Sequence, residues 1–145
     1  MPQPAGIGER LLAGAGALAC LGVLWLAATL TPDPAGHGTH TQIAPWMTPC
    51  AWPLVFGIPC PTCGMTTAFA HAADGAPWAA LRAQPLGGLL ALGAATGFWV
   101  GLHGCVFGSR IGRVYGTLLR PRVLWGLVAL AAGAWGYAIA TWPVA

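Results

Sequence analysis

The fold of this chain is decided by one short stretch, Pro59-Cys60-Pro61-Thr62-Cys63-Gly64. It interrupts an apolar segment, residues 53–73, that would otherwise be long enough to cross a membrane. Pro61 fixes its own φ angle, and Gly64 can adopt a positive φ angle without steric penalty. We therefore expect a tight turn that points both thiols at one spot. The turn would lie within a re-entrant or interfacial helical element, because irregular backbone enters a membrane only where protein buries it.

The composition places the rest of the chain in a membrane. Of its 145 residues, 57% are hydrophobic and only 6% are charged, whereas a soluble domain carries about 25% charged residues. The charged residues are six arginines and three acids. Such a surface could not be kept in water, so we expect an all-α integral membrane protein in a lipid bilayer. The arginines are too few to bind nucleic acid.

Three apolar runs have the length of a transmembrane helix. They cover about residues 11–30, 86–107 and 123–142. Residues 31–85 form an outer loop and the cysteine-containing element, in which we expect short helices over Met65–Ala72 and Pro77–Gln84. Residues 108–122 form a basic loop. The prediction is a single membrane domain over residues 1–145 with three transmembrane helices.

The arginines set the orientation of the spans. With three spans and a cytoplasmic N-terminus, every arginine except Arg82 lies on the cytoplasmic side, as the positive-inside rule requires. The five cytoplasmic arginines are Arg10, Arg110, Arg113, Arg120 and Arg122. The cysteine turn, His37 and His40 then lie on the outer side. We expect a multi-pass protein of a bacterial inner membrane.

The cysteine motif and the residues after it resemble a known family. The chain reads Cys60-Pro61-Thr62-Cys63-Gly64-Met65-Thr66, and later Gln84-Pro85-Leu86. This is similar to an uncharacterised bacterial family of small membrane proteins with a Cys-Pro-x-Cys-Gly-x-Thr-Arg motif and a later Asn-Pro-Leu. Thr67 stands where that family has Arg, and Gln84 where it has Asn. The resemblance covers about a third of the chain and implies the architecture, with no activity to carry over.

The first hypothesis for the cysteine turn is a metal site. Cys60 and Cys63 would supply two ligands, and thiolate ligands suit zinc or copper(I). Two cysteines are half of a tetrahedral site, so further ligands are needed. The candidates on the same side of the membrane are Cys50, His71, His37 and His40. A homodimer could instead supply two cysteines from each copy.

The second hypothesis is thiol–disulfide chemistry at Cys60 and Cys63, with Cys50 as a resolving partner. The outer side of a bacterial inner membrane is oxidising, so a disulfide could form there. No thioredoxin-like pattern of strands and helices surrounds the motif. The third hypothesis is a purely structural scaffold in which a disulfide staples the turn. The residues leave these three readings open.

Other features point to assembly more than to catalysis. Gly93, Gly97 and Gly101 recur every four residues and form a smooth ridge for another helix, either of a partner protein or of a second copy. We therefore expect an accessory subunit of a larger membrane assembly, and a conventional enzyme is the less favoured class. His103 lies inside a span, where we expect it to bond to a neighbouring helix.

Overall fold

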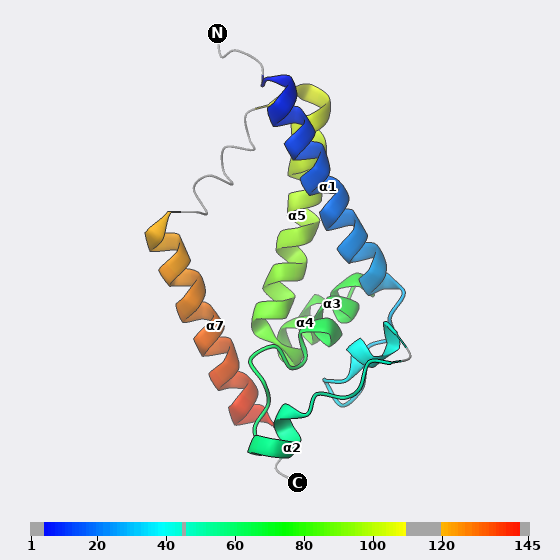
Figure 1. The fold of residues 1–145 in the computed structure, drawn as a ribbon, viewed down its shortest axis with the longest axis vertical. Helices are drawn as coiled ribbons and strands as arrows, with labels where there is room; N and C mark the ends of the chain where they lie inside the picture. Colours follow the sequence, from blue (N-terminus) through cyan, green and yellow to red (C-terminus); the bar gives the residue numbers. More distant parts are fainter. Residues whose placement is uncertain (1–4, 45, 110–119, 143–145) are drawn as a thin grey trace.

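The structure is a computed structural model that describes residues 5–44, 46–109 and 120–142 (Figure 1). These residues form helices and loops, with no strand among them. Three helices are long and apolar enough to cross a membrane: α1 (Ile7–Ala28), α5 (Pro85–Phe107) and α7 (Pro121–Thr141). The prediction of an all-α membrane protein with three spans is thereby confirmed. Most of the predicted basic loop, residues 110–119, lies outside the described residues.

Helices α1 and α5 pack closely along one another through small residues (Figure 1). A Cβ atom added at Gly101 would lie 2.7 Å from the carbonyl oxygen of Ala13 and 3.1 Å from the Cβ of Ala17. One added at Gly104 would lie 3.3 Å from the Cβ of Ala13. Small residues thus let the two backbones approach, as in many membrane helix pairs. We call this contact the seam.

The predicted glycine ridge is divided by the seam. Gly101 is buried against α1 of the same chain, so it is used within the molecule. A Cβ atom at Gly93 would meet no atom within 4 Å. Contact of this ridge with a partner or a second copy stays a prediction. Gly101 already packs against α1, so it is not available for such a contact.

One end of the seam is closed by Arg10. Its guanidinium donates from Nε to the carbonyl of Cys105, at 2.8 Å, and from an Nη atom to the carbonyl of Val106, at 2.9 Å. The Ala5 amide donates to the carbonyl of Gly108 at 2.9 Å. These bonds satisfy carbonyls at the C-terminal end of α5 that have no partner within the helix. Helix α1 begins at Ile7 and ends at Ala28, whereas the predicted span covered about residues 11–30.

His103 lies near the same end of α5. Its Nδ1 is 2.9 Å from the Oγ of Ser109, and its ring centroid is 4.7 Å from that of Phe107. The bond that His103 makes within the described residues is therefore to Ser109, in the two residues that follow α5, and not to a neighbouring helix as predicted.

The opposite end carries the short elements. These are η1 (Thr39–Gln42), α2 (Trp52–Phe56), α3 (Met65–Ala73) and α4 (Pro77–Ala83). The predicted helices over 65–72 and 77–84 match α3 and α4 to within one residue. Helix α3 contacts α1, α4 and α5, so it lies against the long helices at this end of the molecule. We call residues 31–84 the cysteine end.

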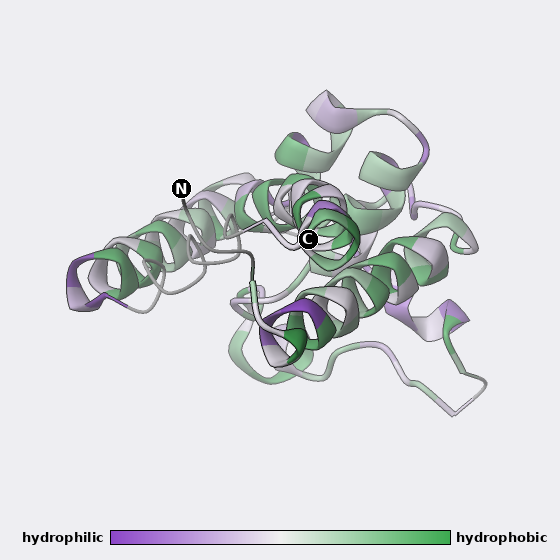
Figure 2. Ribbon diagram, turned by 90° about the horizontal axis from the view of Figure 1, so that it is seen from above, coloured by the Kyte–Doolittle hydropathy of each residue, from purple (hydrophilic) through white to green (hydrophobic). Residues whose placement is uncertain are grey.

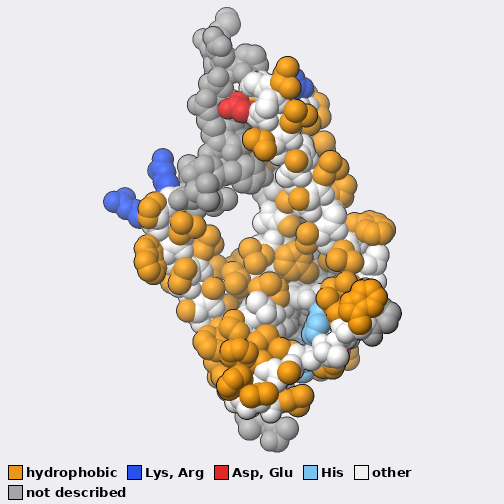
Figure 3. All heavy atoms as spheres, in the orientation of Figure 1, with side chains coloured by type: hydrophobic (Ala, Val, Ile, Leu, Met, Phe, Trp, Pro, Cys, Tyr) orange, Lys and Arg blue, Asp and Glu red, His pale blue; other side chains and the backbone are white. Residues whose placement is uncertain are grey.

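Helix α7 reaches the rest of the molecule at the cysteine end, and stands apart from α1 and α5 over much of its length (Figure 1). Its Trp135 Nε1 donates to the carbonyl of Pro59 at 2.9 Å, and its Tyr137 hydroxyl donates to the carbonyl of Arg82 at 3.2 Å. Hydrophobic residues run along all three long helices (Figure 2) and cover much of the visible flank (Figure 3), as contact with lipid requires.

Candidate metal centre

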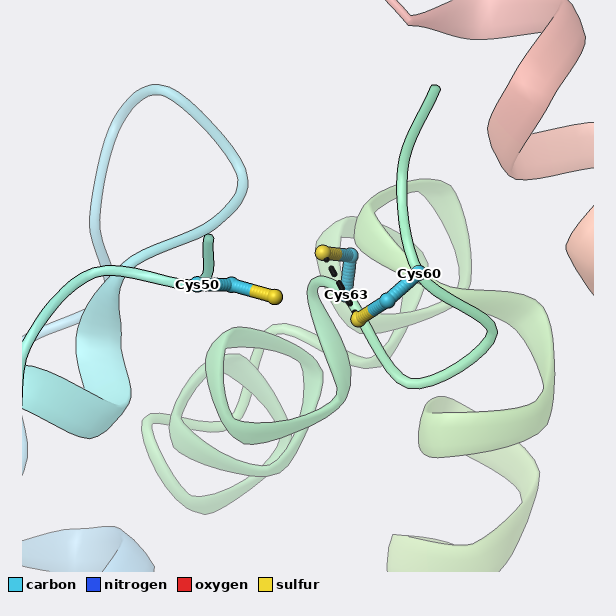
Figure 4. A group of neighbouring side chains, drawn as sticks. All are labelled: Cys50, Cys60 and Cys63. Atoms are coloured by element: carbon cyan, nitrogen blue, oxygen red, sulfur yellow. Dashed lines mark hydrogen bonds between the residues drawn. The ribbon is translucent and has the colours of Figure 1, made fainter. Parts of the chain in front are cut away.

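Three cysteine sulfurs meet at the cysteine end (Figure 4). The Sγ atoms of Cys50, Cys60 and Cys63 all lie within 4.8 Å of one another, and those of Cys60 and Cys63 are 2.9 Å apart. In a tetrahedral zinc site, Zn–S bonds of about 2.3 Å place the sulfurs about 3.8 Å apart. The Cys60–Cys63 separation is shorter than that value and all three separations are at most 4.8 Å, so side-chain rotations would be needed to place three thiolates on one ion.

The three cysteines come from two separate segments. Cys50 lies in the loop before α2, and Cys60 and Cys63 lie between α2 and α3. All five cysteines of the chain are among the described residues, and all are free. The disulfide that we considered for Cys60 and Cys63 is therefore not formed in this structure.

The turn between Cys60 and Cys63 is built as the sequence predicts. The amide of Cys63 donates to the carbonyl of Cys60 at 3.0 Å, and α3 starts two residues after Cys63. Gly64 has φ +83°, a conformation that other residues rarely adopt. A Cβ atom there would also lie 2.9 Å from the carbonyl oxygen of Gly36 and 3.0 Å from that of Ala83. Glycine is therefore required at this position both for its positive φ angle and for its lack of a side chain.

Gln84 anchors the cysteine turn to the start of α5, a role that was not predicted from the sequence. Its side chain is fully buried. Its Nε2 donates to the carbonyl of Pro61 at 3.3 Å, and its Oε1 accepts from the Gly87 amide at 2.7 Å. The amide thus caps α5 and fixes the cysteine turn to it. A signal was present, because a polar residue directly before a proline often precedes a helix start.

Thr67 ties the outer loop to α3. It is fully buried, and its hydroxyl lies 2.8 Å from that of Thr39, which is also buried. The Thr39 hydroxyl in turn accepts from the Asp33 amide at 3.0 Å. At the position where the resembling family has Arg, this chain therefore has a buried hydrogen bond between two segments.

A cavity of about 500 Å³ opens around the sulfurs. Its lining includes the three clustered cysteines together with His37 and His40. The cavity thus brings together five of the six predicted ligand candidates, Cys50, Cys60, Cys63, His37 and His40, and leaves out His71. His71 is in the last turn of α3, which leads away from the cysteine turn, and it lines neither the cavity nor the sulfur cluster.

The two thiols of the turn differ in acidity. For Cys60, burial raises the pKa, but hydrogen bonds from Cys63 and Thr62 outweigh it, so the pKa is lowered overall. For Cys63, burial and the hydrogen bond with Cys60 raise the pKa to about 12. With both groups protonated, the Cys60 thiol donates to the Cys63 sulfur at 2.9 Å. Once Cys60 ionises, Cys63 becomes the donor, because its pKa is the higher. As the pH rises, Cys60 therefore loses its proton before Cys63 does.

Comparison with known proteins gives one family. Residues 50–98 match a family described as a protein of unknown function, DUF2752. The match begins at Cys50, so it includes all three clustered cysteines, Gln84 and the outer part of α5. It does not extend to His37, His40 or α7. No curated protein and no solved structure matched the chain.

Proposed function

We propose that this membrane protein holds a metal ion on the thiolates of Cys50, Cys60 and Cys63. One observation carries the proposal, namely that three sulfurs from two segments lie within 4.8 Å in one cavity. Three soft thiolate ligands favour zinc or copper(I) over the harder magnesium and calcium.

The acidity of the turn supports this role. The lowered pKa of Cys60 favours its thiolate. A metal ion would displace the proton of Cys63, whose pKa is raised by burial and by the hydrogen bond with Cys60. Binding should therefore release protons and weaken as the pH falls. The surrounding hydrogen bonds hold the turn in place before the ion arrives, which lowers the entropy cost of binding.

We place the metal on the outer side of a bacterial inner membrane. The Arg10 end of the seam and the cysteine end are at opposite ends of α5, since Gly108 meets the start of α1 and Gln84 meets the cysteine turn. Positively charged residues favour the cytoplasmic side. Membership of a larger assembly as an accessory subunit stays a prediction.

Metal content of the purified protein tests the proposal. The intact chain, extracted in mild detergent without chelator, should carry about one zinc or copper per chain. Cys50→Ser, Cys60→Ser and Cys63→Ser should each lose most of it. Cys20→Ser is the matched control, because Cys20 lies within α1, and it should keep the metal. An intact protein without metal, or full loading of all three variants, would refute the site.

A second candidate function is thiol–disulfide exchange, which is favoured by the unequal acidity of the two thiols. The Cys60 thiolate would attack a substrate disulfide, releasing one substrate thiolate and forming a mixed disulfide. Cys63 would then attack the Cys60 sulfur, release the second substrate thiolate and leave a Cys60–Cys63 disulfide. Cys63→Ser should trap mixed disulfides, and Cys60→Ser should trap none. Equal behaviour of the two variants would exclude this function.

A further inference from the structure

Three thiolates leave a tetrahedral ion one ligand short, and two histidines line the same cavity. His37 and His40 belong to the outer loop, thirteen and ten positions before Cys50. Cys₃His is one of the usual ligand sets of zinc. The contacts of the loop distinguish the two histidines.

The backbone next to His37 touches the backbone next to Cys63. The carbonyl oxygen of Gly36 lies 2.9 Å from the position that a Cβ atom at Gly64 would occupy. His37 and Cys63 also both line a second, smaller cavity of about 160 Å³, whose lining includes neither His40 nor Cys50. His37 therefore lies beside the cysteine turn, and its ring nitrogens stand outside the three-sulfur cluster, so the ring would have to turn toward the sulfurs to reach an ion held there.

The ring of His37 is prepared to bind through Nε2. Its Nδ1 lies 2.8 Å from the carbonyl oxygen of Ala35, and a carbonyl can only accept, so Nδ1 carries the proton. In the neutral ring, Nε2 then has a free lone pair. Metal-binding histidines commonly donate their other N–H to a carbonyl in this way. The ring also packs on Trp142, with centroids 4.5 Å apart.

The segment that carries His37 is fixed by hydrogen bonds. Asp33 accepts from the Ala35 amide at 2.8 Å through its carboxylate, and its carbonyl accepts from the Gly36 amide at 2.9 Å. Thr39 then joins the segment to Thr67 of α3. Little loop order would have to be gained on metal binding.

His40 is oriented differently. Its Nε2 lies 3.3 Å from the carbonyl oxygen of Thr48, so that nitrogen is the donor and Nδ1 is free. The contact is longer than that of His37 and ties the ring to the segment before Cys50. His40 is therefore a matched control of the same residue type, in the same loop and cavity.

We infer that His37 supplies the fourth ligand through Nε2, so that the centre is a closed Cys₃His site that holds zinc. This inference rests on the proposed metal site and adds both its missing ligand and its metal. A closed tetrahedral site is the arrangement of structural zinc. It would join the outer loop, the cysteine turn and, through Trp142, the end of α7.

Cobalt(II) replacing zinc in the full-length protein tests the inference, because its absorption reports thiolate and geometry separately. His37→Ala should keep the sulfur-to-cobalt charge-transfer bands, change the ligand-field bands, and weaken zinc affinity by about 100-fold or more. His40→Ala should leave both spectrum and affinity unchanged. His37→Cys should restore tight tetrahedral binding with stronger charge transfer, which separates ligand loss from misfolding.

The possible failures are distinguishable. If His37→Ala leaves the ligand-field bands and zinc affinity unchanged while charge transfer persists, the thiolate site stands and the role of His37 is refuted. If His40→Ala has an equal or larger effect, or if the native metal is copper, the inference is likewise overturned. If wild-type protein shows no charge-transfer band, the proposed metal site itself fails.

Discussion

Different interactions stabilise the two regions: close packing of small residues in the seam, and buried hydrogen bonds in the cysteine end. The seam joins two apolar helices through small residues, with Gly101 against Ala13 and Ala17. The cysteine end contains all of the buried polar side chains found among the described residues, Thr39, Thr67 and Gln84. Each of them is hydrogen-bonded. Burying a polar group is costly unless it is bonded, and such bonds fix one arrangement.

The difference shows what each region is for. Close packing of small residues needs only complementary shape, and it stabilises the pair of spans without presenting any reactive group. The polar bonds of the cysteine end hold an irregular backbone in which three thiols converge. Even α7 bonds to this end, through Trp135 and Tyr137. The seam thus offers packing without reactive groups, and the converging thiols lie at the cysteine end.

The largest expected contrast concerns thiol reactivity. In reduced, metal-free protein, a membrane-impermeant maleimide should label Cys60 first, since only thiolates react and the pKa of Cys60 is lowered. The pKa of Cys63 is about 12, so at pH 7 its thiolate fraction is roughly one in 10⁵. Labelling of Cys60 should fall only at pH below the usual thiol range. Peptide mapping checks the order.

Cys105 is the seam control for that experiment. Its Sγ would lie 3.0 Å from a Cβ atom at Gly14, so it is packed against α1. It should stay unlabelled in the folded protein. Initial labelling at Cys105 would remove the contrast between the two regions. Initial labelling at Cys63 would contradict the lowered pKa of Cys60.

The next largest effect is overpacking of the seam. Gly101→Leu should destabilise the protein by about 3 kcal/mol or more, because even its Cβ atom would overlap the Ala13 carbonyl. Gly93→Leu, where a Cβ atom meets nothing within 4 Å, should cost little. Unfolding in mixed detergent measures both. Equal stability of the two variants would show that α1 and α5 do not pack through Gly101.

A smaller effect is expected at Gly64. Gly64→Ala should cost about 1–2 kcal/mol for its positive φ angle, and more for the contact with Gly36. Metal affinity should fall while the seam remains folded. Gly57→Ala is the matched control, because its φ is +68° but its Cβ atom would meet nothing within 4 Å. Metal affinity that falls equally in both variants would mean that the contact with Gly36 is unimportant.

The smallest effect concerns the attachment of α7. Trp135→Phe removes the donor to the Pro59 carbonyl, and a single hydrogen bond contributes about 0.5–1.5 kcal/mol. Thermal unfolding should show a loss within that range, with a slight decrease in metal affinity. Trp125→Phe, at a side chain that is 73% exposed, should change neither. A larger loss at Trp125 would mean that α7 is attached elsewhere.

Much of the fold could be predicted from the sequence because membrane spans leave a strong signal. Long uncharged runs gave the three spans, and helix breakers gave the turn before α3. The contact at the N-terminal end of α1 was less predictable, because the partner of Arg10 is the end of α5, about 95 residues away. No local pattern reports such a contact.

The cysteine end was predictable in its motif and not in its surroundings. The spacing of Cys60 and Cys63 indicated converging thiols, and Cys50 was among the candidates. His71 could have reached the cysteines only if the chain bent back. Helix α3 instead continues to Ala73 and carries His71 about 10 Å along its axis from the cysteine turn. The contacts of Gly36 with Gly64 and of Thr39 with Thr67 join irregular segments. Such segments have no periodicity from which pairing could be inferred.

X-ray absorption at the metal edge of the purified, full-length protein is the most direct test of the thiolate centre. A Cys₃His zinc centre should show three sulfur neighbours at about 2.3 Å and one nitrogen at about 2.0–2.1 Å from zinc. Loss of one sulfur neighbour in Cys50→Ser would confirm that the loop cysteine completes the cluster. A first shell of nitrogen and oxygen alone, or protein that carries no metal, would contradict the account.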